Sequence, residues 1–243
     1  MSNTRNIKHL DLDLIAIDGS KNISRLNLLL SIASHSQQKL NFNTIKIFTG
    51  CDVHDVPQMD NVDLISVGIH SVEQYNNFVL KKLHSYICSE HCLIYQHDGF
   101  IHNPGNWDDT FLQYDYIGAV WPKKWWCPHN RVGNGGFSLR SKKLLSYFTA
   151  KEIDTSRNED MYICVDQYAN MLADGINFAP PGVACRFSLE ENTEFNCDIN
   201  KTFGFHGSAA RKHLYSRTIK MQQELLNICD ETQKKNSHMR LTR

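Results

Sequence analysis

A short apolar run that turns abruptly polar is the stretch of this sequence best suited to chemistry. Residues 92–95 are long enough for a buried strand and too short for a helix, and the polar segment 96–99 follows at once. In open α/β sheets, ligands collect just beyond the carboxyl ends of strands. Asp98 at such an edge could hold a hard cation, which in turn holds phosphates. The alternative is a plain turn, because Asp-Gly is a common turn signal.

Two later segments also carry residue types that suit ligand binding. Gly133, Gly135 and Gly136 occupy three of four consecutive positions, which lets backbone amides approach a ligand or simply permits positive φ in a tight turn. Glu159 and Asp160 open a predicted helix, where carboxylates also stabilise the helix dipole. From the residues alone, dipole stabilisation is the favoured interpretation of this acidic pair.

A single histidine, His206, lies in the compact aromatic and glycine-containing turn 202–207. Its type and position suit metal binding, but a lone histidine is more often structural than a ligand. The residues themselves leave both interpretations open.

The elements that would position these residues follow from hydrophobic periodicity. Strands are predicted at 12–17, 44–49, 63–68 and 92–95, and helices at 22–35 and 72–88. This order is typical of a mostly parallel sheet with right-handed crossovers. The first strand ends at Asp18-Gly19-Ser20, and strand, turn and helix are how nucleotide-binding α/β folds begin.

The second half of the chain is predicted to continue the same α/β domain. We expect strands at 114–120 and 185–189, helices at 141–148, 158–172 and 209–229, and a polar tail at 230–243. We interpret residues 1–243 as one domain. It would have a nucleotide-binding half at about 10–100, an acceptor half at about 101–207, and a C-terminal helix and tail at 208–243.

Composition excludes several classes of protein. The 26 basic and 26 acidic residues balance, so no global charge steers the chain to nucleic acid or membrane. No signal peptide is visible and no run approaches the ~20 apolar residues of a membrane span, so we expect a cytoplasmic protein. None of the eight cysteines forms a CxxC pair, and we expect most of them to be reduced core residues.

Six motifs occur in a fixed order along residues 95–207. They are Gln-His-Asp-Gly-Phe at 96–100, Asn-Pro-Gly-Asn-Trp at 103–107, Tyr-Asp-Tyr-Ile-Gly-Ala at 114–119, Gly-Asn-Gly-Gly-Phe-Ser-Leu-Arg at 133–140, Glu-Asp at 159–160 and Phe-His-Gly at 205–207. Together they resemble a glycosyltransferase of the GT-A type, most of all a family of bacterial and viral glycosyltransferase-like domains. The resemblance implies an α/β fold with a mixed, mostly parallel central sheet flanked by helices.

The resemblance also implies a divalent metal, Mn²⁺ or Mg²⁺. GT-A enzymes usually carry an Asp-x-Asp motif at the end of the fourth strand, and Asp98 matches its second aspartate. Gln96 replaces the first and would hydrogen-bond the sugar or ribose instead. His206 resembles the late histidine that completes the metal shell, and an imidazole beside carboxylate and phosphate oxygens suits Mn²⁺ better than Mg²⁺.

The remaining site residues are implied in the same way. Nucleotide-sugar binding is expected of Asp18, Gln96, His97, Asp98, Gly135 and Gly136. Acceptor binding is expected of Glu159 and Trp107. Asp160 would be the base that removes the acceptor hydroxyl proton, as in inverting galactosyltransferases.

The predicted function is therefore transfer of a sugar, from a UDP-sugar donor, to the hydroxyl of a glycan, lipid, protein or modified nucleic acid. A retaining mechanism stays open. Two other functions also stay open: a sugar nucleotidyltransferase, for which residues 18–21 make a poor phosphate loop, and a carbohydrate-binding module that has lost catalysis. The missing first aspartate is the best argument for the binding module.

Overall fold

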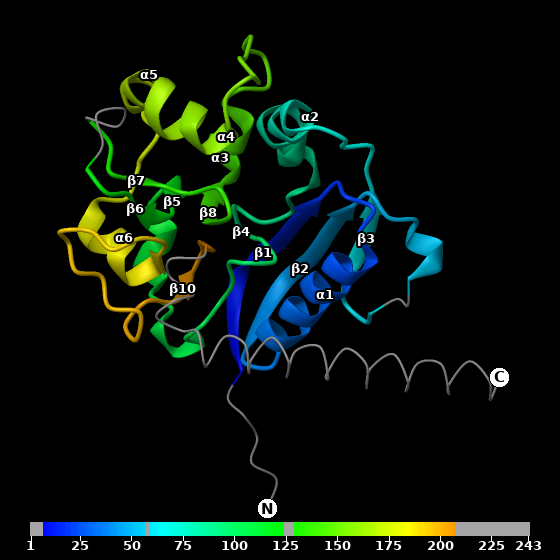
Figure 1. The fold of residues 1–243 in the computed structure, drawn as a ribbon. Helices are drawn as coiled ribbons and strands as arrows, with labels where there is room; N and C mark the ends of the chain where they lie inside the picture. Colours follow the sequence, from blue (N-terminus) through cyan, green and yellow to red (C-terminus); the bar gives the residue numbers. More distant parts are fainter. Residues whose placement is uncertain (1–6, 57–58, 124–128, 208–243) are drawn as a thin grey trace, which may run out of the picture.

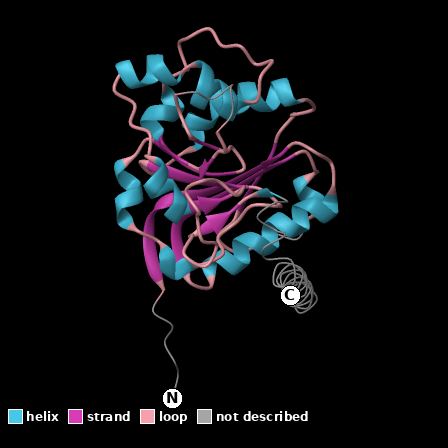
Figure 2. Ribbon diagram, turned by 60° about the vertical axis from the view of Figure 1, so that its left-hand side comes forward, coloured by secondary structure: helices cyan, strands magenta, loops and turns pink. Residues whose placement is uncertain are grey.

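The computed structural model describes residues 7–56, 59–123 and 129–207, which build two sheets with helices on both sides (Figures 1 and 2). The strands are β1 Lys8–Asp18, β2 Leu40–Thr49, β3 Asp63–Ser66, β4 His91–Tyr95, β5 Tyr116–Ile117, β6 Ala119–Val120, β7 Val132–Gly133, β8 Phe137–Ser141, β9 Ser188–Leu189 and β10 Gly204–Phe205. The α-helices are α1 Ile23–Gln37, α2 Val72–Asn77, α3 Lys142–Ser146, α4 Glu159–Met161, α5 Tyr168–Ala173 and α6 Pro181–Phe187. Short 3₁₀ or π segments are η1 Val53–Asp55, η2 Phe78–Lys82, η3 Leu83–Tyr86, η4 Pro104–Asn106, η5 Asp109–Gln113 and η6 Tyr162–Asp166.

The larger sheet has six strands in the order β3-β2-β1-β4-β8-β5. β1, β2, β3 and β4 run parallel, whereas β8 is antiparallel to both β4 and β5. A smaller sheet has the order β10-β9-β6-β7. The predicted mixed, mostly parallel sheet flanked by helices is therefore confirmed.

Successive side chains along each strand point to opposite faces of the sheet, so the core has two layers. In β1, Leu14 and Ala16 pack in the layer under α1, while Ile15 and Ile17 pack against the α2–α5 side. Both faces of a parallel sheet are covered, so its strands are apolar almost throughout. Each fully buried aliphatic side chain contributes about 1.5–3 kcal/mol to folding, which fixes the register and hence the edge where the site forms.

Helix α1 begins where the sequence predicts. The side chain of Asn22 accepts a hydrogen bond from the Arg25 amide, as a helix N-cap does. Leu26, Leu29 and Leu30 are buried against the sheet. This helix therefore fixes the turn that follows Asp18, the last residue of β1.

The helix predicted over residues 72–88 is continuous but changes type along its length. It consists of α2, η2 and η3 and ends at Tyr86. The buried side chain of Asn76 donates to the carbonyls of Thr155 and Arg157 and accepts from the Glu159 amide. This segment thus holds the backbone that leads into α4.

The strand predicted over residues 114–120 is divided between the two sheets. β5 pairs with β8 in the large sheet, and β6 pairs with β7 and β9 in the small one. Gly118 lies between them, and a Cβ there would come 1.9 Å from the carbonyl oxygen of Gly133. Only glycine allows the chain to change sheets at this close approach.

The strand predicted at 185–189 is wrong for most of its length. Residues up to Phe187 belong to α6, and only Ser188 and Leu189 form a strand. Pro181 is the first residue of α6, where proline is favoured because its φ suits a helix and its missing N–H is not needed. Pro181 was therefore the feature of the sequence that indicated a helix at this position.

One pair of cysteines is an exception to the expectation that most of them are reduced. Cys185 and Cys197 form a disulfide. Among the described residues, Cys51, Cys92 and Cys164 are buried free thiols, as expected, and Cys88 is an exposed one.

The predicted helix 209–229 and tail lie outside the described residues. Among the helices that the structure describes, none is long and apolar enough to cross a membrane.

Candidate active site

The polar segment after β4 forms a tight turn at the carboxyl edge of the large sheet. The amide of Gln96 donates to the Gly99 carbonyl, and the Gly99 amide donates back to the Gln96 carbonyl. Asp98 lies in this turn, and its carbonyl accepts from the Gly207 amide. The turn therefore joins the end of β4 to the chain that follows β10.

His206 meets this turn although it is 110 residues from Gln96. Its Nε2 lies 3.4 Å from Oδ1 of Asp98 and 3.3 Å from Oε1 of Gln96. Phe205 packs edge-on against Phe100 at 4.8 Å between ring centroids, and both rings are buried. Aromatic packing next to each polar residue thus holds the two segments together.

Two glycines make room for the His206 ring. A Cβ on Gly136 would lie 2.0 Å from His206 Nε2, and a Cβ on Gly99 would lie 2.6 Å from His206 Cδ2. These contacts are far inside ordinary van der Waals separation. Gly136 is thus needed for close packing against the imidazole.

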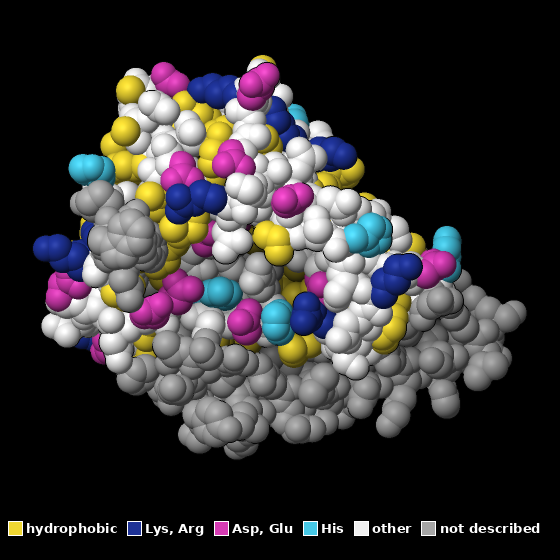
Figure 3. Space-filling model, turned by 45° about the horizontal axis from the view of Figure 1, so that its top comes forward, with side chains coloured by type: hydrophobic (Ala, Val, Ile, Leu, Met, Phe, Trp, Pro, Cys, Tyr) yellow, Lys and Arg dark blue, Asp and Glu magenta, His cyan; other side chains and the backbone are white. Residues whose placement is uncertain are grey.

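A cavity of about 650 Å³ opens at the same edge and is lined by Asp18, Gln96 and His97. Lys21, which precedes α1, and Arg25 in its first turn also line the cavity. Figure 3 shows a hollowed face where histidine, acidic and basic side chains gather. The volume falls within the range of small-ligand sites.

Asp18 braces the turn beside this cavity. Its carboxylate accepts from the amide and the hydroxyl of Ser20, both at 3.0 Å, and lies 3.6 Å from the Arg25 guanidinium. Because β1 and β4 are parallel with Ala16 opposite Tyr95, Asp18 and His97 end at the same edge. The structure therefore brings together four of the predicted nucleotide-sugar residues: Asp18, Gln96, His97 and Asp98.

Asp160 reaches the neighbouring glycine turn. Its Oδ2 accepts from the Gly135 amide at 3.0 Å, and its Oδ1 accepts from the Met161 amide at 2.8 Å. The next residue, Gly136, lies against His206. The predicted base and the predicted metal ligand thus border one turn.

Glu159 lies behind that turn in a buried ion pair. Both of its oxygens accept from Arg140, at 2.8 and 2.9 Å, and the two side chains are 4% and 0% exposed. A Cβ on Gly135 would lie 2.3 Å from Glu159 Oε1. The structure turns Glu159 toward Arg140 and away from solvent, which is at odds with the predicted acceptor contact.

Trp107 is the predicted site residue that the structure does not bring to the site. Its indole packs against Phe111 and Phe203, and its Nε1 donates to Asp109, which also pairs with Lys8. Lys8 begins β1, whose eleven residues span about 30 Å. Trp107 therefore lies by the opposite end of the strand, where the ring is a core residue, and this placement does not support the predicted acceptor contact.

Three residues that the motifs did not assign support the site. Glu190 contacts His206, with its Oε1 at 3.2 Å from Nδ1. Tyr75 lines the cavity; burial raises its pKa and keeps the hydroxyl neutral for a hydrogen bond with Gln96. Arg140 is the last residue of the glycine-containing motif at 133–140, so the sequence could have indicated it. Neither Glu190 nor Tyr75 belongs to a motif.

The pKa values of two cationic side chains of the site, His206 and Arg140, are shifted from their ordinary values. Burial by itself would lower the pKa of His206, but hydrogen bonds to the carboxylates of Asp98 and Glu190 outweigh it and raise the pKa to about 9. Burial also disfavours the charge of Arg140, yet the Glu159 carboxylate raises its pKa well above the ordinary value. Around neutral pH the protein alone therefore holds a protonated imidazole between two carboxylates.

The donors around His206 Nε2 fit a divalent ion. Among the described residues no group of three His, Cys, Asp or Glu side chains could hold one, but Gln96 adds an amide oxygen beside Asp98 and His206. Neighbouring ligands of an octahedral ion with bonds of about 2.1 Å lie about 3 Å apart, close to the 3.3 and 3.4 Å found here. Magnesium-like ions commonly take few protein ligands and complete their shell with phosphates and water.

The fold is that of the GT-A proteins. The structure resembles a galactosyltransferase, LgtC, in complex with donor and acceptor sugar analogues, with a TM-score of 0.52, 13% identity, and coverage of 88% of this chain and 95% of that chain. A more distant likeness is to the glycosyltransferase GlyE of Streptococcus pneumoniae TIGR4, with a TM-score of 0.43, 12% identity, and coverage of 94% and 64%. At these identities the likeness to LgtC establishes the fold alone.

Residues 58–206 match the family described as Protein of unknown function (DUF5672), and the chain belongs to that family. No curated protein matches the sequence significantly. The matched region contains the Gln96–Gly99 turn, both glycines of the second turn, the acidic pair and His206.

Proposed function

We propose that this chain is a glycosyltransferase, which moves a sugar from a nucleotide-sugar donor, a UDP-sugar, to an acceptor hydroxyl. One observation carries the proposal: Asp98, Gln96 and His206 converge beside a cavity that is also lined by Asp18 and His97. The donor's nucleotide would lie in that cavity with its diphosphate next to Asp98. The fold shared with LgtC supports this assignment.

Asp98 and His206, with Gln96 beside them, would hold Mn²⁺ or Mg²⁺. A bound ion would neutralise the charge of the departing diphosphate. Gln96 Oε1 and the carboxylate of Asp98 face the same side of the imidazole, so these three side chains orient the donor's phosphates together. Gly136 lies directly against the ring, where a side chain would displace the imidazole.

Asp160 would take the proton from the attacking hydroxyl, which gives inversion at the sugar carbon. Its carboxylate is fixed by two backbone amides, and each oxygen retains a lone pair for a further hydrogen bond. Glu159 would act through its ion pair with Arg140, which supports the glycine turn from behind. The acidic pair would thus divide into one reacting and one supporting carboxylate.

The test is a panel of nucleotide-sugars, assayed for binding and hydrolysis with and without Mn²⁺. A matched donor should stabilise the fold by mass action and turn over only with the metal. Asp160→Asn should abolish transfer and leave donor binding nearly intact. Loss of both binding and transfer in Asp160→Asn would contradict the role of base.

The panel also separates this proposal from a carbohydrate-binding module. That alternative rests on Gln96, which stands where an aspartate is usual. A binding module would bind sugars or nucleotide-sugars with no turnover of any donor, whether or not Mn²⁺ is added.

A further inference from the structure

The histidine of the site is held from both sides, and its second contact has no part in the function proposed above. Nδ1 of His206 lies 3.2 Å from Oε1 of Glu190. An ionised carboxylate only accepts hydrogen bonds, so Nδ1 must carry the proton of this contact. Nε2, the other ring nitrogen, is then left facing Asp98 and Gln96.

Three acceptors therefore converge on one point when the imidazole is neutral. They are Nε2 of His206, Oδ1 of Asp98 and Oε1 of Gln96, and none of them can donate to another in that state. Such a point is suited to a donor or a cation, for example a second proton on the ring or a metal ion. Metal-bound histidines commonly donate their other N–H to a carboxylate, which fixes both tautomer and ring orientation.

Glu190 is itself fastened by its second oxygen. Trp121 donates from Nε1 to Glu190 Oε2 at 3.1 Å, and the backbone amide of His206 donates to the carbonyl of Leu189 at 2.9 Å. Glu190 directly follows β9, so its backbone starts from a fixed strand. The carboxylate thus bridges the indole of Trp121 and the imidazole of His206.

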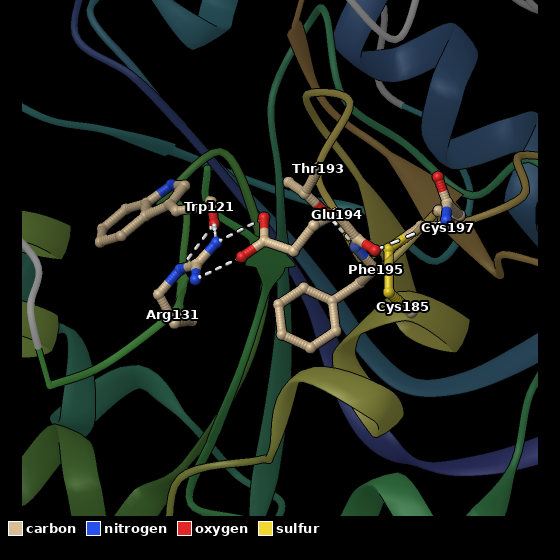
Figure 4. The surroundings of a disulfide bond; sticks show 8 residues. Trp121, Arg131, Cys185, Thr193, Glu194, Phe195 and Cys197 are labelled. Carbon is tan, nitrogen blue, oxygen red and sulfur yellow. Dashed lines mark hydrogen bonds and ion pairs between the residues drawn. A yellow bond between two sulfur atoms is a disulfide. The ribbon is translucent and has the colours of Figure 1, made fainter. Parts of the chain in front are cut away.

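The segment that carries Glu190 is anchored at its far end as well (Figure 4). Arg131 donates to both oxygens of Glu194, at 2.7 and 3.0 Å, and to the carbonyl of Trp121 at 3.1 and 2.9 Å. The disulfide between Cys185 and Cys197 closes the segment over a separation of 12 residues. One arginine therefore ties the closed segment to the tryptophan that holds Glu190.

We propose that Glu190 is a positioning residue that fixes the His206 ring with Nε2 turned toward Asp98 and Gln96, ready to bind a divalent ion. The inference rests on the proposed function and deepens it, because it assigns the orientation of the metal-binding histidine to the disulfide-closed segment. Glu190 would act only through His206 and would contact neither the ion nor the donor.

The first experiment measures Mn²⁺ binding to the full chain by electron paramagnetic resonance, with UDP and, separately, GDP as the nucleotide probe. Glu190→Ala should weaken Mn²⁺ binding about 10- to 100-fold, the range for loss of such an outer contact. Glu190→Gln keeps an acceptor oxygen and should recover part of the loss. The matched control is Glu191→Gln, an exposed neighbour, which should bind like the wild type.

The inference would be overturned if Glu190→Ala bound Mn²⁺ within about twofold of the control while His206→Ala lost Mn²⁺ binding. That result would leave the proposed function standing. No Mn²⁺ binding by the wild type with either nucleotide would instead contradict the proposed metal site. Circular dichroism of each variant confirms that the comparison is made on folded protein.

The second experiment examines the ring in the metal-free protein and so does not depend on the metal site. A ¹⁵N correlation spectrum should detect a protected Nδ1–H of His206 in the wild type and in Glu191→Gln. That signal should be lost in Glu190→Ala. Its persistence there would show that Glu190 does not orient the ring, whatever the result with Mn²⁺.

Discussion

Two carboxylate–cation contacts flank the Gly135–Gly136 turn, and they differ in burial and in freedom. The Arg140–Glu159 pair is closed, bidentate and almost inaccessible to water. His206 is partly exposed and is shared between Asp98 and Glu190 at 3.4 and 3.2 Å. Burial closes the bidentate pair to a ligand, whereas the longer contacts of the partly exposed His206 can be exchanged for a metal. The first supports the site and the second is suited to do its chemistry.

The difference predicts that stability depends most on the closed pair. Glu159→Gln leaves the Arg140 charge buried without its partner and should destabilise the fold by about 3–5 kcal/mol. Chemical denaturation measures this loss. Asp98→Asn changes the partly exposed contact and should lower the free energy of unfolding by less than about 1 kcal/mol. Equal losses of stability in the two variants would contradict the difference between the two contacts.

The disulfide should matter next, because it closes the segment on the His206 side only. Replacing Cys185 and Cys197 together by serine should cost about 3 kcal/mol through the added freedom of the unfolded chain. Reduced and oxidised wild type, compared by thermal melting, should show the same difference. An unchanged melting temperature would mean that contacts such as Arg131–Glu194 hold the segment unaided.

Gly136→Ala sharpens the comparison because it acts on the His206 side without removing a charge. The new Cβ meets the imidazole, so the ring must move, at a stability cost of about 1–3 kcal/mol. Mn²⁺ and donor binding should fall with it. Gly105→Ala, where a Cβ meets nothing within 4 Å, is the matched control, and equal behaviour of the two variants would contradict close packing at His206.

Trp107→Phe should have the smallest effect and tests whether Trp107 acts as a core residue or contacts the acceptor. The indole hydrogen bond to the exposed Asp109 is lost, so about 1 kcal/mol of stability should go with it. Acceptor affinity and turnover should stay within about twofold of wild type because the ring lies at the opposite edge of the sheet. A selective rise in the KM for the acceptor would restore the role that the motif implied.

Much of the half at about residues 10–100 could be predicted from the sequence because its signals are local. The strand before Gln96 and the helix after Asn22 are set by apolar periodicity and an N-cap, and both stand where predicted. The approach of Asp98 to His206 was anticipated only through the motif resemblance. Periodicity alone gives no information about two residues so far apart.

What could not be predicted depends on contacts between distant segments. Glu190 belongs to no motif, and its role follows only from the meeting of β9 with the chain after β10. The disulfide could not be derived because cysteine spacing does not determine pairing. Trp107 is the opposite case, since the motif implied an acceptor contact and the structure packs the ring in an aromatic core.

The central claim is that a divalent ion joins the donor's diphosphate to Asp98 and His206. Its most direct test is calorimetric titration of a UDP-sugar into the wild type and into Asp98→Ala, each with Mn²⁺ and with EDTA. The account predicts that Mn²⁺ strengthens binding to the wild type at least tenfold and has little effect on Asp98→Ala. Equal strengthening by Mn²⁺ in both proteins would contradict it.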